Sequence, residues 1–406
     1  MKRIAIIVTL DTKSEEAAYL RELILQLGHQ ALIIDVGCGG LPGMEADIPA
    51  VEVAAAAGAD LENLRASRDR DMATGAMIRG AVAKLDALCQ AGEVEGLISI
   101  GGMSSAVMAS SIYREMPYRI PKLLLTTAAS MPQANRFFGP SGVTVMHSLI
   151  EVGAFNRLLM GELARAAGAI CGMVEGQALV RLPAKLKPMV AMSTNGWVET
   201  PAQYLANELK DEYEIVRFHG TGLPEVVMEK LVEEDYFTAV IDLVPSSITN
   251  ERFDGSRVSW PRRLEVAGEM GVPQVIAPSL VNVISRTRDT SAALTEEMKS
   301  RKYYFMDSLR ILLWLSKDEL TDIASVYAEK VNRAVGPTKF LIPMRGWLNV
   351  ETEDSEYFEP ESIRAFADVL KKKVKPEVEI REVDANIDTV EFGQALLLAF
   401  REVTGE

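Results

Sequence analysis

Ile4-Ala5-Ile6-Ile7-Val8 is an apolar run of strand length, and Thr9-Leu10-Asp11-Thr12-Lys13 follows it directly. A helical pattern begins immediately afterwards. This order of buried strand, polar loop and helix predicts the first unit of a parallel α/β sheet. Thr12 and Lys13 offer a hydroxyl and an ammonium to a phosphate, and Asp11 offers a carboxylate to a metal or a ribose. An ordinary helix N-terminus explains the same residues, so both interpretations stay open on this evidence.

The alternation of strand and helix continues to the end of the chain. The predicted strands are 4–8, 31–36, 96–100, 121–126, 143–146, 189–193, 214–218, 238–243, 273–276, 339–343 and 378–383. The predicted helices are 14–27, 49–57, 70–91, 104–114, 151–171, 200–210, 224–234, 261–270, 317–334, 360–372 and 390–401. We therefore expect an α/β protein with two doubly wound, mainly parallel-sheet (Rossmann-like) domains that face each other across a cleft. The expected domains are residues 1–180 and 181–406, and the polar segment 285–305 is expected to form a loop or flap.

Composition excludes several classes of function. The net charge of −14 argues against a broad nucleic-acid surface, which needs a basic footprint. No apolar stretch reaches the length of a membrane helix, and no signal-peptide pattern opens the chain. Cys38, Cys89 and Cys171 lie far apart, which excludes a cysteine-based zinc site and fits a reducing compartment. We expect a cytoplasmic protein with no nucleic-acid or membrane partner.

Small and polar residues follow several predicted strands of the first half. The carboxyl ends of parallel strands meet at one edge of a sheet, so these residues are expected to line one crevice. The predicted nucleotide-binding residues are Asp11, Thr12, Lys13, Asp35, Gly37, Gly101, Gly102, Ser104, Ser105, Thr127 and Ser130. Asp35 is placed to hold a ribose, and Lys13 with the turn 101–105 to hold phosphates. Tight turns alone would also explain any single loop, and neither a GxGxxG nor a P-loop motif is present.

A second group of residues offers acid–base or metal chemistry. His147 and His219 follow predicted strands, and Asp242 ends another. Together with Arg345 they are the candidate catalytic residues of a small-molecule enzyme, and no metal ligands are assigned. Solvated strand ends explain the same carboxylate, and structural roles explain the histidines. Ser104, in a turn between strand and helix, loosely matches a nucleophile elbow, which keeps a serine hydrolase open.

The chain also resembles the ATP-binding domain family named after the tomato mosaic virus resistance protein. The resemblance spans nearly the whole chain. Its matching positions are Thr9, Asp11-Thr12-Lys13, Asp35-Val36-Gly37, Gly101-Gly102, Thr127, Ala129-Ser130, Met146-His147-Ser148, Asn156-Arg157, His219, Thr221-Gly222, Asp242, Pro343, Arg345-Gly346 and Val383-Asp384-Ala385. The resemblance implies two α/β subdomains, a nucleotide site in the first, ATP with Mg²⁺ as the ligand, and a homodimer.

The sequence departs from the family pattern in the phosphate loop and at two histidines. The family's Gly-Gly-Ser-Gly-Gly-Thr loop reads Gly101-Gly102-Met103-Ser104-Ser105-Ala106 here. A His-Asn-Pro segment is replaced near Met306, and a family histidine stands as Asn386. The sequence thus predicts an ATP-binding protein that acts on a small molecule. The alternatives are a non-catalytic binding or regulatory module, and a hydrolase or lyase that acts on a phosphorylated or carboxylated metabolite without ATP.

Overall fold

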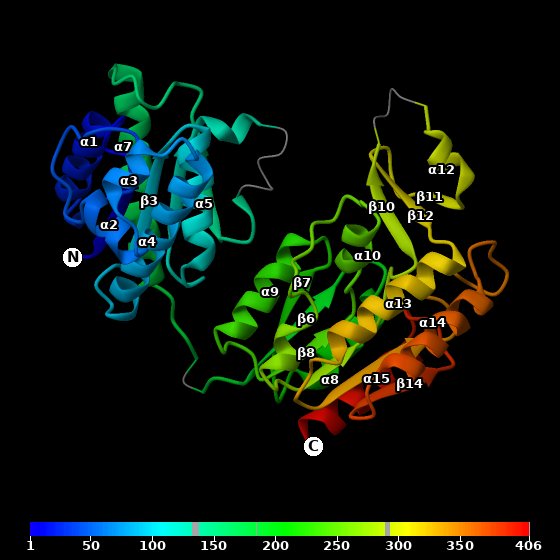
Figure 1. Ribbon diagram of the computed structural model, residues 1–406. Helices are drawn as coiled ribbons and strands as arrows, with labels where there is room; N and C mark the ends of the chain where they lie inside the picture. Colours follow the sequence, from blue (N-terminus) through cyan, green and yellow to red (C-terminus); the bar gives the residue numbers. More distant parts are fainter. Residues whose placement is uncertain (132–137, 184, 289–292, 406) are drawn as a thin grey trace. The chain divides into compact units, whose positions relative to one another are not determined.

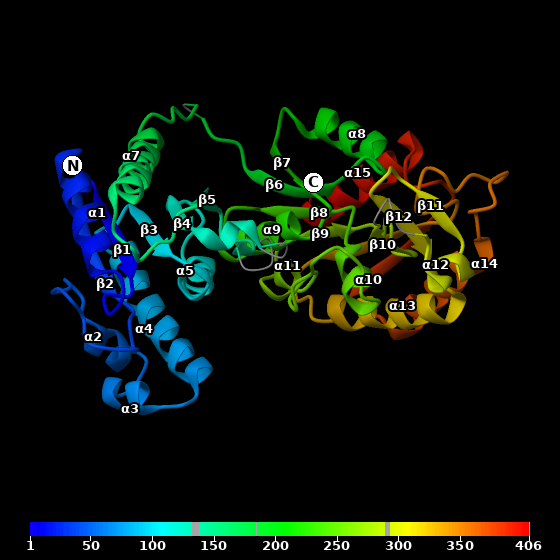
Figure 2. The same ribbon diagram turned by 90° about the horizontal axis from the view of Figure 1, so that it is seen from above.

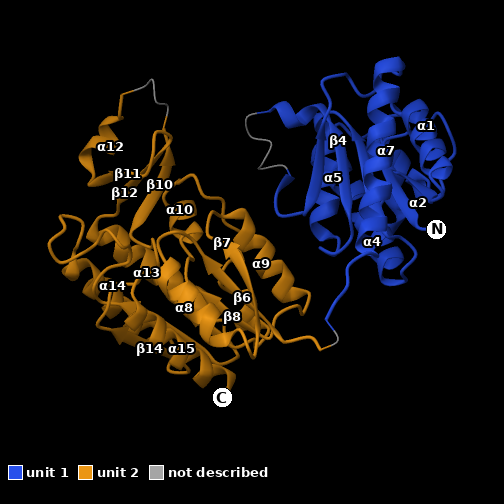
Figure 3. Cartoon of the chain, turned by 180° about the vertical axis from the view of Figure 1, so that it is seen from behind, with its two compact units in different colours: residues 1–183 blue, residues 184–406 orange. Residues whose placement is uncertain are grey.

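The computed structural model describes residues 1–131, 138–183, 185–288 and 293–405. The chain forms two compact units, Met1–Pro183 and Ala184–Glu406 (Figure 3). Each unit is built around its own parallel sheet, and each is described by itself below. Within the described ranges, no helix combines the length and the apolar character needed to cross a bilayer.

Unit 1 is a five-stranded parallel sheet with helices on both faces (Figure 1). Its strands are β1 (Arg3–Val8), β2 (Gln30–Asp35), β3 (Gly96–Gly101), β4 (Lys122–Thr126) and β5 (Val143–His147). Its helices are α1 (Ser14–Gln26), α2 (Ala50–Ala56), α3 (Leu61–Ala66), α4 (Arg70–Gln90), α5 (Met103–Glu115), the short 3₁₀ helix η1 (Thr127–Ser130) and α7 (Arg157–Gln177). The strand order is β2-β1-β3-β4-β5, so the direction of winding reverses between β1 and β3.

The two faces of β1 explain how this sheet is covered. Ile4, Ile6 and Val8 point to one face, where they pack with α1 and α7. Ala5 and Ile7 point to the other face, where they pack with α2, α4 and α5. Successive residues of a strand alternate between faces, so a strand buried on both sides must be apolar throughout. That is why the sequence shows a continuous apolar run here instead of an alternating one.

Unit 2 contains a six-stranded parallel sheet with the order β14-β13-β9-β8-β6-β7, of which Figure 2 labels β6, β7, β8 and β9. Its strands are β6 (Met189–Thr194), β7 (Glu214–His219), β8 (Ala239–Asp242), β9 (Gln274–Ile276), β13 (Thr338–Pro343) and β14 (Val378–Val383). Its helices are α8 (Glu199–Leu209), α9 (Leu223–Glu233), α10 (Ser247–Arg252), α11 (Val266–Glu269), α13 (Lys317–Val331), α14 (Pro360–Lys373) and α15 (Val390–Thr404). The predicted fold class, an α/β protein with two mainly parallel sheets, is confirmed.

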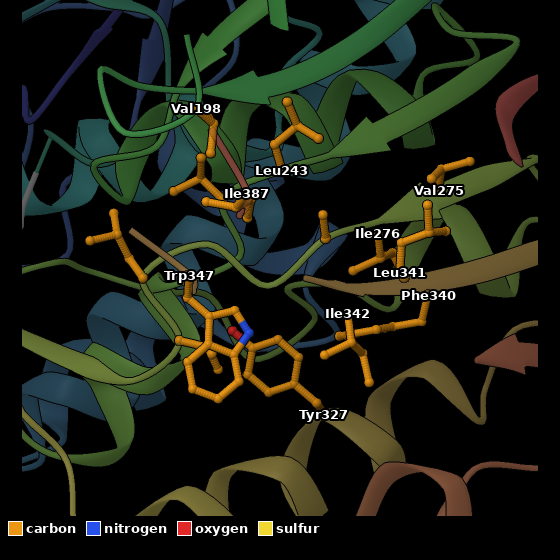
Figure 4. Close-up of a cluster of buried hydrophobic side chains, with 14 of the residues drawn as sticks. Val198, Leu243, Val275, Ile276, Tyr327, Phe340, Leu341, Ile342, Trp347 and Ile387 are labelled. Carbon is orange, nitrogen blue, oxygen red and sulfur yellow. The ribbon is translucent and has the colours of Figure 1, made fainter. Parts of the chain in front are cut away.

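The core of unit 2 joins the main sheet to residues from its loops. Trp347 and Ile387, which follow β13 and β14, belong to the same buried cluster as the strand residues Phe340 and Ile342, part of which Figure 4 shows. Tyr327 of α13 packs edge-on against Phe340, with ring centroids 6.2 Å apart. The segments at the carboxyl ends of these strands are therefore held by the core itself, and they have defined positions.

A small antiparallel sheet extends unit 2, and here the predicted loop was wrong. β10 (Val283–Thr287) and β11 (Tyr303–Phe305) both pair with β12 (Arg310–Trp314), and α12 (Glu296–Ser300) lies between β10 and β11 in sequence. Figure 1 shows this extension at one end of the unit. Its polar residues mask the strand pattern, because only one face of an antiparallel sheet needs to be buried. Residues 289–292 of the predicted loop lie outside the described residues.

Some helix predictions also needed correction. The helix predicted for 151–171 begins at Arg157, because the Asn156 side chain accepts hydrogen bonds from the N–H groups of Leu158 and Leu159. Of the helix predicted over 261–270, the structure forms only Val266–Glu269. The short helices α3 and α10 were missed, since six residues carry too little periodicity to recognise.

Candidate functional site

The candidate site of unit 1 lies where β1 and β3 end side by side. These strands are neighbours in the sheet, with Ile7 opposite Ser99, so the loops after Val8 and after Gly101 begin next to each other. The winding reverses between these two strands. In open α/β sheets, ligands bind outside the carboxyl ends of the strands at such a reversal.

Lys13 connects the two loops. An ideal Cβ built on Gly101 would lie 2.9 Å from Lys13 Cε and 2.5 Å from Ser105 Cβ. The Lys13 Nζ donates a hydrogen bond of 3.0 Å to Thr12 Oγ1, and this hydroxyl lies 3.0 Å from Thr9 Oγ1. In the described part of the chain, the Lys13 ammonium makes no ion pair. An ammonium and two hydroxyls thus gather beside the start of α5.

The first turn of α5 offers its backbone donors. Gly102 is the N-cap residue and has no side chain, so no side-chain cap satisfies the N–H groups that follow it. A Cβ on Gly102 would lie 3.7 Å from Thr127 Oγ1, which places η1 beside this turn. Ser130 donates from its hydroxyl to the Thr127 carbonyl, at 3.0 Å. Ser104 is exposed in the same turn of α5. The predicted residues of the β3 and β4 ends are therefore brought together.

Asp11 and Asp35 hold the loop after β2. Asp35 Oδ1 accepts hydrogen bonds from the N–H groups of Leu10, at 3.0 Å, and of Gly37, at 2.9 Å. Asp11 Oδ2 accepts one from the N–H of Gly39, at 2.8 Å. Asp35 is only 2% exposed, and burial raises its pKa against the opposing effect of the two N–H groups. Asp35 thus organises two loops, and its buried position does not fit the ribose contact predicted for it.

Two arginines that the sequence reasoning missed adjoin the loop after β2. Arg65 Nη2 donates to the Gly40 carbonyl at 2.8 Å, and a Cβ on Gly39 would lie 3.8 Å from Arg70 Nη2. Arg70 begins α4 and is exposed. Both residues belong to a stretch that carries three arginines within six positions, from 65 to 70. These three arginines could have indicated an anion-binding segment. Because α3 was not predicted, the sequence did not show that this segment returns to the edge of the sheet.

The pocket between these loops is small. It has a volume of about 10 Å³, room for one water molecule. Its lining residues are Ile7, Val8, Thr9, Val36, Ser99, Ser105, Met108 and Ala109. A phosphate would therefore bind on the surface formed by the loops and not inside this pocket.

His147 stands apart from this group. It ends the edge strand β5, is exposed, and lies opposite Thr126 of β4. Ser148, which follows it, is buried and donates to Glu162 Oε2 at 2.5 Å. No described contact joins His147 to Ser104.

Asp242 of unit 2 belongs to a buried ionic cluster and not to an open site. Its carboxylate binds Arg263 through both oxygens and accepts a hydrogen bond of 2.6 Å from Ser193. Arg263 is fully buried and also pairs with Glu229, at 2.9 Å, and with Glu225, at 3.3 Å. Asp242 is 1% exposed, so this arrangement gives it a structural role in place of the predicted catalytic one.

His219 remains exposed at the end of β7. Burial, followed by the charges of Arg257 and Arg310, lowers its pKa from the ordinary value. Arg257 donates from Nη1 to the carbonyl of Gly220, the residue after His219, at 3.0 Å. The structure therefore places His219 among cations that the sequence reasoning did not connect with it.

Arg345 lies elsewhere on the same sheet edge, after β13. Its Nε donates to Asp384 Oδ1 at 2.6 Å, and its Nη1 pairs with Glu353. Asn386, at a position where the resembling family has histidine, donates to the carbonyls of Arg345, Leu348 and Glu351. An asparagine amide fits this bonding role, and it secures the loop after β13. No described contact brings Arg345 to His219.

The described residues form no metal site made of protein ligands alone. Across residues 1–131, 138–183, 185–288 and 293–405, no three His, Cys, Asp or Glu side chains gather as a metal-binding group. Asp11 is the carboxylate of the loop that carries Lys13. Mg²⁺ commonly takes one or two carboxylates with phosphate oxygens and waters, so a nucleotide-borne ion remains compatible with these residues.

Comparisons with known proteins agree on the family. A UPF0261 protein of Clostridium tetani is 32% identical over 398 residues, 97% of each chain. The UPF0261 protein BMEII0128 of Brucella melitensis is 30% identical and covers 98% of this chain and 94% of its own. The "ToMV susceptible protein tm-1(GCR26)" of Solanum lycopersicum is 24% identical over 322 residues, which are 76% of this chain but 41% of the tomato protein.

The resemblance to one solved structure is remote. The UDP-GlcNAc 2-epimerase of Neisseria meningitidis aligns with 68% of this chain and 82% of its own, at 9% identity and a TM-score of 0.24. That likeness carries no conclusion about function. By contrast, residues 2–179 match the N-terminal domain, and residues 187–404 the C-terminal domain, of the family described as "Uncharacterised protein family (UPF0261)". The chain therefore belongs to the UPF0261 family.

Proposed function

We propose that unit 1 binds the phosphates of a nucleotide, ATP with Mg²⁺, at the ends of β1 and β3. The observation that carries the proposal is the position of Lys13, whose side chain crosses Gly101 at the start of α5. A lysine beside the free N–H groups of a helix start is an arrangement suited to phosphate oxygens. The resemblance to the ATP-binding domain family supports the choice of ATP among nucleotides.

The proposed roles follow from the donors present. The N–H groups of Met103, Ser104 and Ser105 would hold one phosphate, and Lys13 would neutralise its charge. Thr127 would donate from its hydroxyl on the η1 side, and Arg70 would reach an anion from the side of Gly39. Bound Mg²⁺ would supply charge neutralisation between phosphates, with Asp11 as its protein ligand. The proposal concerns the phosphate end of the nucleotide.

The test is calorimetric titration of the full-length chain with ATP, with and without Mg²⁺, with AMP as a comparison. Lys13→Ala should weaken ATP binding by at least about tenfold, the loss expected when a charge-assisted contact to phosphate is removed. Lys84→Ala is the matched control, because Lys84 is a surface lysine of α4 in unit 1 that is already paired, with Glu52 of α2. ATP binding that is unchanged in Lys13→Ala would remove Lys13 from the site.

Two further properties are proposed on the resemblance and composition alone. These are a homodimer, which light scattering of the purified chain tests, and a cytoplasmic location, which cell fractionation tests. Turnover of a small molecule is proposed only as a consequence of nucleotide binding. If neither ATP nor AMP binds, the non-catalytic module and the ATP-independent hydrolase or lyase become the leading alternatives.

A further inference from the structure

β11 of the small antiparallel sheet packs beside the segment that follows β6. Tyr304 of β11 makes an edge-on contact with Trp197, which follows β6, with ring centroids 6.0 Å apart. Arg310 begins β12, and its charge acts on both His219 and Arg257. β6 and β7 are adjacent, with Thr194 opposite His219. The Ser256 N–H also donates to the Ser285 carbonyl of β10, at 2.7 Å, and β10 pairs with β12, so backbone contacts join the strand that carries Arg310 to the segment of Arg257.

Arg257 is the buried member of this group. It is only 9% exposed, and its Nη1 donates to the Gly220 carbonyl, at 3.0 Å, and to Ser246 Oγ, at 2.5 Å. Its Nε and Nη2 have no hydrogen-bond acceptor among the residues that the structure describes. A buried guanidinium with donors to spare, held beside an exposed imidazole, is well suited to bind an anion.

The acidic groups around this cluster are already engaged. Glu225 is fully buried, and its carboxylate accepts hydrogen bonds from the Gly222 N–H and the Ser247 hydroxyl. Asp307 faces Arg310, with 2.6 Å between Oδ2 and Nη2, and it also accepts from the backbone N–H groups of the turn between β11 and β12. Asp307 therefore offsets part of the charge of Arg310, whereas Glu225, the acidic group nearest in effect to Arg257, also pairs with Arg263, so Arg257 carries the main positive charge beside His219.

We propose that His219, Arg257 and Arg310 form a second anion site, in unit 2, which takes the phosphate or carboxylate group of a small organic molecule. Arg257 supplies donors from a buried position, while the exposed His219 and Arg310 supply the others. The rings of Trp197 and Tyr304 flank this edge and offer apolar contact to the remainder of the molecule. The site stands on residues of unit 2 alone, so it does not depend on nucleotide binding by unit 1.

The test follows the His219 ring by NMR in the full-length chain labelled with ¹³C in its histidine rings. The sequence has three histidines, His29, His147 and His219, and His219→Gln assigns the signal of interest. The probes are inorganic phosphate and succinate. Either anion should shift the His219 signal saturably and raise the pKa of its imidazole, because a bound negative charge favours the protonated ring. Saturation by one probe and not the other identifies the preferred group.

Three variants make the assignment specific. Arg310→Ala should weaken the response by about tenfold, since one charge-assisted contact is lost. Asp307→Asn should strengthen it, because the carboxylate that competes for Arg310 is removed while the turn keeps an acceptor oxygen. Arg364→Ala is the matched control, an exposed arginine on α14 outside the cluster. A His219 signal that neither anion moves overturns the site, and an equal response in Arg310→Ala and Arg364→Ala overturns the role of Arg310.

Discussion

Lys13 lies against Gly101, with its Cε 2.9 Å from the point where a Cβ on that glycine would stand. Gly101 also has a φ of +148°, in a region that residues with a side chain rarely adopt. Both the space and the backbone conformation therefore require glycine at the end of β3. The relationship ties the loop after β1 to the loop after β3, although 87 residues of sequence separate the two positions.

Gly101→Ala should destabilise unit 1 and displace Lys13. The strained φ and the crowding against Ser105 together should cost about 1–3 kcal/mol of unfolding free energy, measured by urea unfolding followed by circular dichroism. ATP binding should weaken in the same variant. Gly168→Ala is the control: this glycine lies in α7, and a Cβ there would meet no neighbouring atom within 4 Å, so the variant should be neutral or more stable by about 0.5–1 kcal/mol. Equal stability of the two variants would contradict the crowding argument.

Asp35→Ala should lower the unfolding free energy by about 1–3 kcal/mol, because the N–H groups of Leu10 and Gly37 lose their shared acceptor. Asp35→Asn keeps an acceptor oxygen and should retain most of the stability. Urea unfolding of both variants checks the order. If Asp35→Ala were as stable as the wild type while ATP binding alone fell, the carboxylate would be a ligand contact and not an organiser of the loops.

Arg263→Met should destabilise unit 2 by about 3–5 kcal/mol, since it leaves Asp242, Glu229 and Glu225 buried without their shared cation. The measurement is urea unfolding followed by tryptophan fluorescence, because all four tryptophans lie in unit 2. Arg252→Ala removes an exposed arginine that pairs with Asp322, and it should change stability by less than about 1 kcal/mol. A mild effect of Arg263→Met would show that the cluster is not essential to the fold.

The stability of unit 2 should fall as pH rises from about 5 to about 8. Burial raises the pKa of Glu351 to about 7, although Asn282, Trp347 and Trp314 donate hydrogen bonds to it. Between the ordinary glutamate pKa and this raised value, Glu351 keeps its proton in the folded state but has lost it in the unfolded state. The unfolding free energy therefore decreases as pH rises towards the folded pKa.

Glu351→Gln tests the contribution of this one carboxyl. The variant cannot ionise, so its stability should decline less between the same two pH values, by an amount of up to about 3 kcal/mol. Tryptophan fluorescence in urea, recorded across this range, gives both curves. Burial also raises the pKa of Glu225 to about 7, so a residual decline should remain in the variant. Parallel curves for the two proteins would show that Glu351 does not contribute.

The candidate residues fall into two groups: those whose place at a strand end could be predicted from the sequence, and those whose surroundings are set by segments elsewhere in the chain. Lys13, Gly101, Gly102 and Thr127 end or directly follow buried strands, and the structure places them at one edge of unit 1. Asp242 ends a buried strand in the same way, yet Arg263, 21 residues later, binds its carboxylate. Sequence position alone shows that a residue ends a strand, but it does not show what packs over that end.

The sequence by itself determined the α/β class and most strands and helices, because burial on one or both faces leaves a periodic apolar pattern within each segment. It also determined that polar loops follow the strands. Only the tertiary structure decided the strand order that joins Lys13 to Gly101, the burial of Asp35 and Asp242, and the meeting of Arg257 and Arg310 at His219. These depend on contacts between segments far apart in the chain, and such contacts leave no local pattern in the sequence.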